Sequence, residues 1–587
     1  MHFVGRFSRA AVLAAGCSIA ASAFALNPGE TVDNFRLIDH NGGAQELYYR
    51  SDAKAIVLLT HMNECDGVRA SAQALEGLRA KYGQQGVEFL MLDSNLGTSR
   101  EAIAADAKKL ALNVPIMIDD TQLVGESLGL KTNGEVFVIT PQAGWKVAYR
   151  GAADGTEAAL DAVLAGKPVA TATKAATGCA VSLPEVAKRK AHAQISYEKQ
   201  IAPILQEKCV ACHREGGIGP WAMTSYDMIK GFSPMIREVV RTKRMPPWHA
   251  DPHYGAWAND RGLTVEQART LVHWVEAGAP RGTGTDPLAT TKKQYPTWEL
   301  GEPDLVVETP AFTTPKTGVI PYQNVTVKNP LKEDKWIRAI AYLPGQRAVL
   351  HHVIASVGGE RFGATSLDNY VPGAEPLVMP EGNGILLKAN STFHFQMHFT
   401  PNGQELTDVT KLGLYFMKDK PKHEFRSMIF AQPRLKIPAN TKFHPEQAVN
   451  TFKADAMIYS LHPHAHFRGK SASFVAKYPD GREEMLLNIP NYDFNWQSTY
   501  QLTKPIQVPA GTKIVYTQTF DNSSQNKANP DPNRTVTWGE QTWDEMVFGV
   551  VRYRNLVETG KDDNKVIGPS QEDLFSDKPP QTSRLQH

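Results

Sequence analysis

Two cysteines and a histidine at positions 209, 212 and 213 form the most specific chemical pattern in the chain. In a Cys-x-x-Cys-His sequence, the two thiols can attach a haem through thioether bonds while the histidine binds its iron. The rival interpretations are a redox-active cysteine pair and half of a zinc site. We predict one covalent haem c, held by Cys209, Cys212 and His213.

A methionine at position 245 could complete the iron coordination from the other side. It lies in the sequence Arg244-Met-Pro-Pro-Trp248, where a rigid Pro-Pro turn after a helix can hold a thioether toward the iron. Methionine and histidine together raise the haem potential for electron transfer. His249 is the competing ligand, and an ordinary core role for Met245 is the third interpretation. We predict Met245 as the sixth ligand, and the segment resembles a small class I cytochrome c domain.

Grouped histidines mark the second half of the chain, which has no cysteine after Arg214. A metal site there must therefore use imidazole, thioether or carboxylate ligands. Residues two apart in a strand face the same side, so His464 and His466 can converge on one ion. Imidazole with thioether favours copper, although zinc with three histidines remains open.

The order of four short patterns makes a resemblance specific. These patterns are His351-His352, Gln-Met-His398-Phe, His464-Ala-His466 and Trp-Asp-Glu-Met546. Over residues 300–555 they are similar to the copper type II, ascorbate-dependent monooxygenases, the family of peptidylglycine α-hydroxylating and dopamine β-monooxygenases.

That resemblance implies two copper ions on two β-sandwiches that face a solvent-filled cleft. It implies an electron-transfer copper held by His351, His352 and His398. It also implies an oxygen-binding, catalytic copper held by His464, His466 and Met546. Because His351 and His352 are adjacent, a regular strand would point them to opposite faces, so a bulge or a strand end is required.

The chain departs from the peptide-amidating members of that family at their substrate-binding positions. Where those enzymes carry an arginine, an asparagine and a tyrosine, this sequence has His462, Phe548 and Val550. A glycine-extended peptide is therefore not the expected substrate.

An alternation of strand and helix patterns precedes the haem motif. Buried strands are predicted over 55–60, 87–92 and 135–139, with helices between them, which is typical of an α/β sheet. The segment resembles the thioredoxin-like redoxins, including peroxiredoxins. Cys65 follows the first of these strands, but Val68 and Met62 replace that group's second cysteine and threonine. Independent redox chemistry at Cys65 and a structural Cys65–Cys179 disulfide both remain open.

The fold class that follows is multidomain, with an α/β thioredoxin-like domain, an all-α cytochrome c domain and two all-β sandwiches. The predicted boundaries are a signal peptide (1–25), the redoxin domain (26–168), a linker (169–194), the cytochrome c domain (195–282), the first copper sandwich (296–445), the second (446–560) and a tail (561–587).

Composition limits the partners and the location. The 587 residues carry a net charge of +2, so no strong field favours nucleic acid, and no apolar run is long enough for a transmembrane segment. Two arginines, a short apolar stretch and Ala23-Phe-Ala25 predict a Sec signal peptide cleaved after Ala25. We expect a periplasmic or secreted protein.

The predicted function is copper-dependent hydroxylation of a C–H bond of a small or peptidic organic substrate with O2. The haem would deliver electrons, replacing or supplementing ascorbate, and would receive them from a donor in the periplasm. The alternative is a non-enzymatic haem and copper electron carrier that serves another exported enzyme. A copper-storage or structural module is the third hypothesis.

Overall fold

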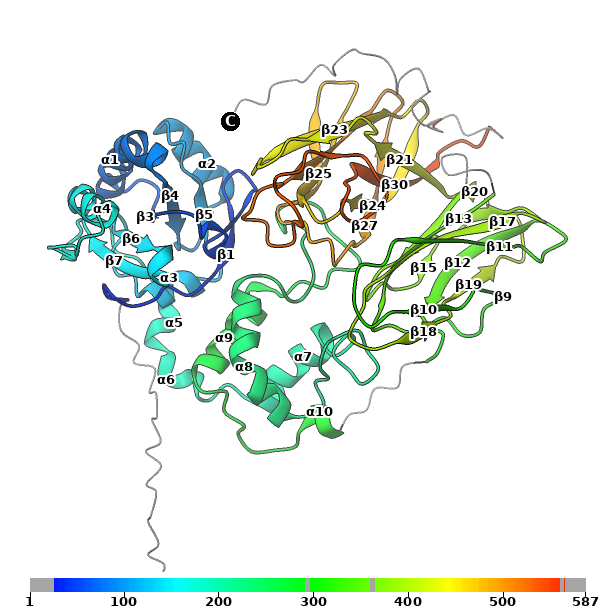
Figure 1. The fold of residues 1–587 in the computed structure, drawn as a ribbon, viewed down its shortest axis with the longest axis horizontal. Helices are drawn as coiled ribbons and strands as arrows, with labels where there is room; N and C mark the ends of the chain where they lie inside the picture. Colours follow the sequence, from blue (N-terminus) through cyan, green and yellow to red (C-terminus); the bar gives the residue numbers. More distant parts are fainter. Residues whose placement is uncertain (1–25, 291–295, 359–364, 560–563, 565–587) are drawn as a thin grey trace, which may run out of the picture.

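The computed structural model describes residues 26–290, 296–358, 365–559 and Asn564. The predicted signal peptide and all of the predicted tail except Asn564 lie outside these residues. Figure 1 shows an α/β part, a helical part below it, and two β parts that pack side by side. Within the described residues, no helix is both long enough and apolar enough to cross a membrane.

The first part is an eight-stranded sheet with the strand order β2-β1-β5-β4-β3-β6-β7-β8. The central pairs β3–β4 and β4–β5 are parallel, whereas β6 runs antiparallel to β3. The strands are β1 (Arg36–Asp39), β2 (Ala44–Glu46), β3 (Ala55–His61), β4 (Val87–Asp93), β5 (Ile116–Ile118), β6 (Val136–Thr140), β7 (Lys146–Gly151) and β8 (Thr173–Lys174). The helices are α1 (Asp66–Tyr82), α2 (Arg100–Lys109), α3 (Leu123–Leu128) and α4 (Thr156–Leu164).

Both faces of this sheet are covered, which explains why the predicted strands are continuous apolar runs. Alternate residues of β3 belong to two separate cores. Val57 and Leu59 pack in the core under α1 and α4, and Ile56 and Leu58 pack in the core with α3. The thioredoxin-like α/β prediction therefore agrees with the structure of this part.

The predicted linker is instead built into the first part. Its strand β8 pairs with β7, and the Asn133 amide donates to the Cys179 carbonyl at 2.7 Å. A disulfide joins Cys65 to Cys179, which settles the alternative left open for Cys65. Two short helices, α5 (Pro184–Ala187) and α6 (Arg189–His192), then lead to the helical part. The low periodicity of this segment reflects its irregular packing and not a lack of structure.

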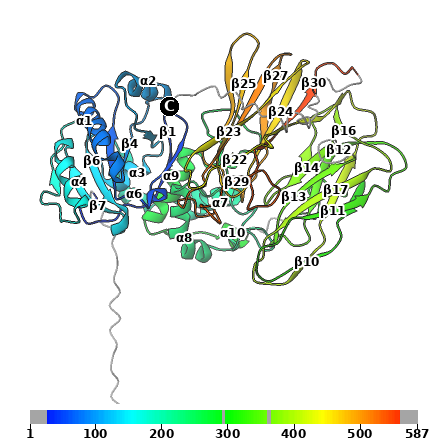
Figure 2. The same ribbon diagram turned by 45° about the horizontal axis from the view of Figure 1, so that its top comes forward.

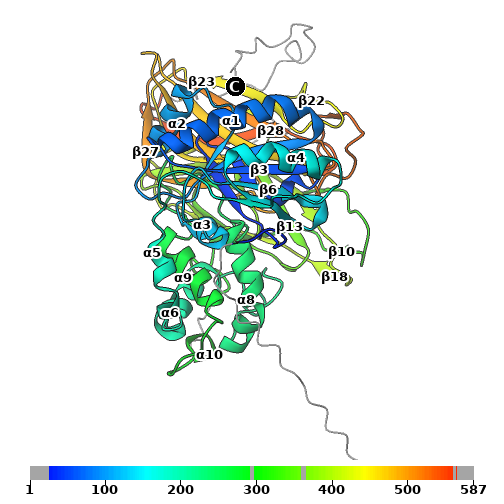
Figure 3. The same cartoon turned by 90° about the vertical axis from the view of Figure 1, so that its left-hand side faces the viewer.

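The helical part contains a π-helical turn (Tyr197–Ile201), α7 (Ala202–Lys208), α8 (Tyr226–Arg241), α9 (Val265–Glu276) and α10 (Pro287–Thr290). Helical periodicity in the sequence predicts helices over 197–206, 228–242 and 264–276, close to the bounds of α7, α8 and α9. The core contains Ile201, Leu205, Ile229, Leu271 and the fully buried Trp274. Figure 3 shows these helices lying against one end of the α/β part, next to α3.

The first β part has two main sheets that enclose a common core. The sheet that carries site residues has the order β11-β17-β13-β14 and consists of β11 (Gln323–Lys328), β13 (Leu350–Val357), β14 (Thr365–Tyr370) and β17 (Thr392–Phe399). The other contains β9 (Leu305–Glu308), β12 (Lys335–Leu343), β15 (Leu377–Val378), β16 (Asn383–Leu387), β19 (Lys411–Phe416) and β20 (His423–Glu424). A short pair joins β10 (Phe312–Thr314) to β18 (Leu406–Asp408).

The second β part repeats the two-sheet plan. One sheet has the order β21-β30-β24-β27, from β21 (Arg426–Ala431), β24 (Ala456–His464), β27 (Tyr500–Val508) and β30 (Phe548–Asn555). The other has the order β23-β28-β25-β26, from β23 (His444–Thr451), β25 (Gly469–Lys477), β26 (Glu483–Ile489) and β28 (Lys513–Phe520). The strands β22 (Lys436–Ile437) and β29 (Val536–Thr537) form a separate pair. Because β21 pairs with β30, this part begins at Arg426, about twenty residues before the predicted boundary.

Buried polar contacts join the parts, which lie close together in the turned view of Figure 2. Asp251, in the loop between α8 and α9, is fully buried and accepts two hydrogen bonds from Arg100, at 2.6 and 3.0 Å. The same carboxylate accepts a hydrogen bond from Asn488 of β26 at 3.0 Å. One carboxylate therefore connects the α/β part, the helical part and the second β part.

Replacing both Cys65 and Cys179 by serine should destabilise the first part by about 2 to 4 kcal/mol, because the disulfide closes a long loop in the unfolded chain. Hydrogen exchange of the β3 amides measures the opening free energy of this part separately from the others. The matched control is the parent protein without reductant. Unchanged β3 exchange in the double variant would contradict a stabilising role.

Candidate metal centre between the two β parts

Three histidines of the first β part come together through strand pairing. His352 on β13 lies directly opposite His398 on β17. The pairing register shifts between Leu350 and His352, so His351 is the extra residue of a bulge. This is the irregularity that the adjacent histidines require. Their possible ligand atoms all lie within 4.8 Å of one another, which is the arrangement that a single metal ion needs.

Nitrogen atoms in this group lack hydrogen-bond partners. His352 is 1% exposed and His398 is 6% exposed, yet His352 Nε2 and His398 Nδ1 have no partner among the described residues. A buried polar atom without a partner carries a desolvation cost of about 1 to 3 kcal/mol. A metal ion would remove that cost, so the residues fit a metal ligand set.

A second histidine pair comes from the second β part. His464 ends β24 and His466 follows it, with ring centroids 5.2 Å apart. His466 Nδ1 donates to the Asp544 carbonyl at 3.2 Å, while its Nε2 is buried without a partner among the described residues. His464 Nδ1 donates to Gln497 Oε1 at 2.6 Å. A hydrogen bond at one ring nitrogen fixes the other as the ligand atom, as in protein metal sites generally.

The segment that contains Met546 is hydrogen-bonded to the loop that contains His466. Glu545 is fully buried, and its carboxylate accepts the backbone N–H groups of His466 and Arg468 at 2.8 and 2.5 Å. Met546 follows directly and is half-buried. Glu545 therefore holds the backbone next to Met546 against the loop of His466, and the Met546 thioether as a third ligand stays a prediction.

The two histidine groups meet in a closed, buried interface. The ring centroids of His352 and His464 are 6.4 Å apart. Phe494 stacks on His351 with centroids 5.0 Å apart and also approaches His466 at 6.0 Å. The expected placement on two facing β parts agrees with the structure, but the expected solvent-filled cleft does not, because aromatic side chains fill the space between the groups.

Burial keeps these imidazoles neutral. Desolvation lowers the pKa of His398 to about 3 and that of His464 to about 4. The pKa values of His352 and His466 are also lowered by burial, and nearby histidines add to the effect. A neutral imidazole has a free electron pair, so the site is prepared for a metal ion at neutral pH.

Two residues of this centre were not predicted from the sequence. Gln497 contacts both groups, since its Nε2 also lies 3.5 Å from His352 Nδ1. Tyr322 lies with its ring 4.9 Å from His398 and 6.3 Å from His466, and its buried hydroxyl has no partner among the described residues. Both are single polar residues in loops, and no spacing pattern distinguishes them in the sequence.

The predicted haem motif lies in the loop after α7. His213 Nδ1 donates to the Trp221 carbonyl at 3.1 Å, which leaves Nε2 as the available ligand atom. Gly219 lies close against this ring, since a Cβ there would come within 2.7 Å of His213 Nδ1. Cys209 and Cys212 are half-buried free thiols. These features fit a histidine that is held in place and would be available to bind a haem iron.

The two alternatives for the sixth ligand lie in different surroundings. His249 lies beside Asp493 and next to Tyr500, both in the second β part, and burial lowers its pKa to about 4. Met245 is half-buried and its amide donates to the Val239 carbonyl of α8 at 3.3 Å. The structure thus places His249 at the interface with the second β part, and Met245 as the sixth ligand stays a prediction.

Comparisons with known proteins concern the first part of the chain. Residues 28–151 match the AhpC/TSA family. This part is a thioredoxin-like redoxin domain. Among curated proteins, none matches the chain.

Several solved structures are similar to the chain. A hypothetical protein from Sinorhizobium meliloti 1021 is 23% identical, with 27% of this chain and 95% of that chain covered and a TM-score of 0.26. Peroxidoxin BcpB from Mycobacterium tuberculosis is 19% identical, with 24% and 95% covered and a TM-score of 0.21. A thiol-disulfide oxidoreductase from Bacteroides fragilis NCTC 9343 is 18% identical, with 21% and 89% covered and a TM-score of 0.19.

The stability of the metal-free protein should fall as the pH decreases below about 6.5. A histidine whose folded pKa is lowered keeps its full contribution above the unfolded value near 6.5 and loses it toward the folded value. For His398 and His464, with folded values of about 3 and 4, the loss approaches about 1.4 kcal/mol per pH unit per imidazole. Denaturant unfolding between pH 7 and pH 5 measures the slope. A flat profile would contradict the neutral, buried state of these rings.

Replacing Gln497 by leucine should weaken copper binding at the His464 group about 10- to 100-fold, because the ring loses the acceptor that orients it. Competition with a copper chelator measures the affinity. The exposed Gln447 on β23 offers a matched control, and its replacement by leucine should leave the affinity unchanged. Equal affinities in both variants would exclude the orienting role.

Proposed function

We propose that the chain is an exported copper-dependent monooxygenase that hydroxylates a C–H bond with O2 and takes electrons from a c-type haem in the same chain. The observation that carries this proposal is the set of buried imidazole nitrogens without partners, which come from two β parts and meet at one interface. Zinc would also accept nitrogen ligands, but the predicted Met546 thioether favours copper.

The ligands divide into the two groups that the family resemblance implies. The first would use His351, His352 and His398, and the second would use His464, His466 and Met546. When bound, copper would supply one-electron redox chemistry and oxygen activation, which side chains cannot supply. Each three-ligand set leaves a coordination position open, as a catalytic metal requires.

The chain's own residues orient the ligands and exclude water. Gln497 and the Asp544 carbonyl fix the ring tautomers of His464 and His466. Phe494 and Tyr322 fill the space between the two groups. Phe548 lies edge-on to His464 with centroids 5.9 Å apart, where the peptide-amidating enzymes that this segment resembles have a polar residue. An apolar contact at this position supports a substrate without a carboxylate to anchor.

The position of the haem motif supports an electron supply to the first group. Cys212 Sγ lies close to Gly373, because a Cβ at Gly373 would be 3.3 Å from that sulfur. Gly373 follows β14, and Tyr370 of β14 pairs with Val353, the residue after His352. A single strand pair therefore separates the cysteine of the predicted haem from the first histidine group.

A specific observation favours the electron-carrier alternative. Aromatic rings pack against the histidines, and two cavities of the described residues lie elsewhere. One is lined by residues such as Arg214, Arg347 and Tyr370, and the other lies in the first domain beside Val147. An enzyme must open the interface between the β parts to admit substrate, whereas an electron carrier need not.

Replacing Met546 by isoleucine should nearly abolish O2-dependent hydroxylation, because the second group loses its thioether ligand. The protein should still contain one haem, and copper at the His351 group should be retained. The measurements are metal content, visible absorption of the haem, and O2 uptake with a panel of small organic substrates.

Met457→Ile on β24 is the matched control, since this residue lies at the far end of the strand from His464. Two results together would support the electron carrier and overturn the enzyme. The haem would be oxidised by copper and O2 equally in both variants, and the parent would show no substrate-dependent O2 uptake. A parent protein without bound copper would overturn both.

A further inference from the structure

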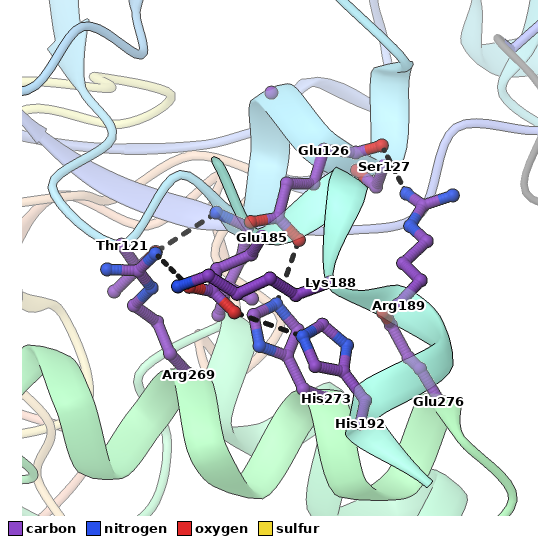
Figure 4. Close-up of polar contacts among 12 residues, drawn as sticks. Thr121, Glu126, Ser127, Glu185, Lys188, Arg189, His192, Arg269, His273 and Glu276 are labelled. Carbon is purple, nitrogen blue, oxygen red and sulfur yellow. Dashed lines mark hydrogen bonds and ion pairs between the residues drawn. The ribbon is translucent and has the colours of Figure 1, made fainter. Parts of the chain in front are cut away.

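A second cluster of metal-ligating side chains lies far from the first, where the redoxin domain meets the helical part (Figure 4). Its members are Glu126 of α3, Glu185 of α5, His192 of α6 and His273 of α9. The two imidazoles are stacked with centroids 4.1 Å apart and an interplanar angle of 10°. His192, His273 and Glu126 are 8%, 4% and 4% exposed.

In each imidazole, the Nε2 atom lies next to a glutamate oxygen. His192 Nε2 lies 3.0 Å from Glu185 Oε2, and His273 Nε2 lies 2.8 Å from Glu126 Oε2. Ligand atoms of Glu185, His192 and His273 all lie within 4.8 Å of one another. The remaining oxygen of Glu126, Oε1, is buried without a hydrogen-bond partner among the described residues.

Neighbouring cations touch the outer side of this cluster. Lys188 Nζ donates to Glu185 Oε1 at 2.9 Å, and Arg269 lies 3.7 Å from the same oxygen. Both therefore occupy the oxygen that faces away from His192, and the Lys188 side chain is 61% exposed. Arg189 donates to the Glu126 backbone carbonyl at 3.1 Å and not to its carboxylate. The Oε2 atoms of both carboxylates face the imidazoles.

We propose that Glu126, Glu185, His192 and His273 form a binding site for a divalent transition metal ion of the zinc class. Two imidazole nitrogens and two carboxylate oxygens are a ligand set that zinc accepts in tetrahedral sites. The nitrogen-to-oxygen separations of about 3 Å match the distances between neighbouring ligands around such an ion. Ligands from four helices, of which α5 and α6 lie between the two parts, would let one ion hold the redoxin domain against the helical part.

This proposal is independent of the copper and haem assignments, because it shares no residue with them. It also explains an otherwise costly arrangement. The buried Glu126 carboxylate beside the stacked imidazoles, with one oxygen unpartnered among the described residues, is expensive without a cation next to it.

The test uses the full-length protein and Zn²⁺ alone, with bound zinc counted after equilibrium dialysis. Glu126→Gln keeps a hydrogen-bonding group next to His273 but loses the anionic ligand, and His192→Gln loses one imidazole. Each variant should bind one zinc fewer than the parent, or bind it at least 100-fold more weakly. X-ray absorption at the zinc edge should show only nitrogen and oxygen ligands around the zinc ion that the variants lose.

His444→Gln is the matched control, since His444 also pairs with one glutamate, Glu446, at 3.0 Å, but without a second histidine. It should bind as much zinc as the parent. Thermal unfolding provides a second measurement, because zinc should raise the Tm of the parent more than that of Glu126→Gln. Equal zinc binding by the parent and both cluster variants, or an equal loss in the His444 control, would overturn the site.

Discussion

The cost of burying imidazole nitrogens without partners is the constraint on which the central interface depends. At least three such nitrogens, on His352, His398 and His466, lie in one closed region. Leaving them unpaired costs about 1 to 3 kcal/mol each, so selection would replace them with apolar residues unless something occupies the site. The packing of two β parts around these rings is therefore understandable as a scaffold for ligands and not as an ordinary core.

The backbone provides this arrangement through a local irregularity. In a regular strand, His351 and His352 would lie on opposite faces of the sheet. The bulge opposite Phe399 and His398 turns both toward one point. A bulge next to a functional site is a common way of redirecting a side chain. On the other β part, the buried Glu545 carboxylate fixes the His466 loop by accepting hydrogen bonds from its backbone.

How much the sequence predicts depends on whether the signal is local. Apolar runs and periodicity predicted the redoxin sheet and helices α8 and α9, because these elements bury their own patterned faces. Residue order predicted which histidines group together. Gln497 and Tyr322 could not be predicted, because their roles arise only where separate loops meet. The close contact of the two histidine groups and the ordered structure of the segment before α5 were missed for the same reason, since long-range packing leaves no periodic signal.

The contacts between the parts argue that the chain works as one assembly. Asp251 and Arg100 form a buried pair with two hydrogen bonds, and such a pair needs both partners in place. Arg552 of β30 donates to the Ser366 and Leu367 carbonyls of the first β part, so a buried guanidinium also joins the two β parts. Separating the two β parts would break these hydrogen bonds and remove the pairing that balances the desolvation of the buried guanidinium. The polar contacts of Arg552 therefore hold the two β parts together beside the aromatic packing of Phe494.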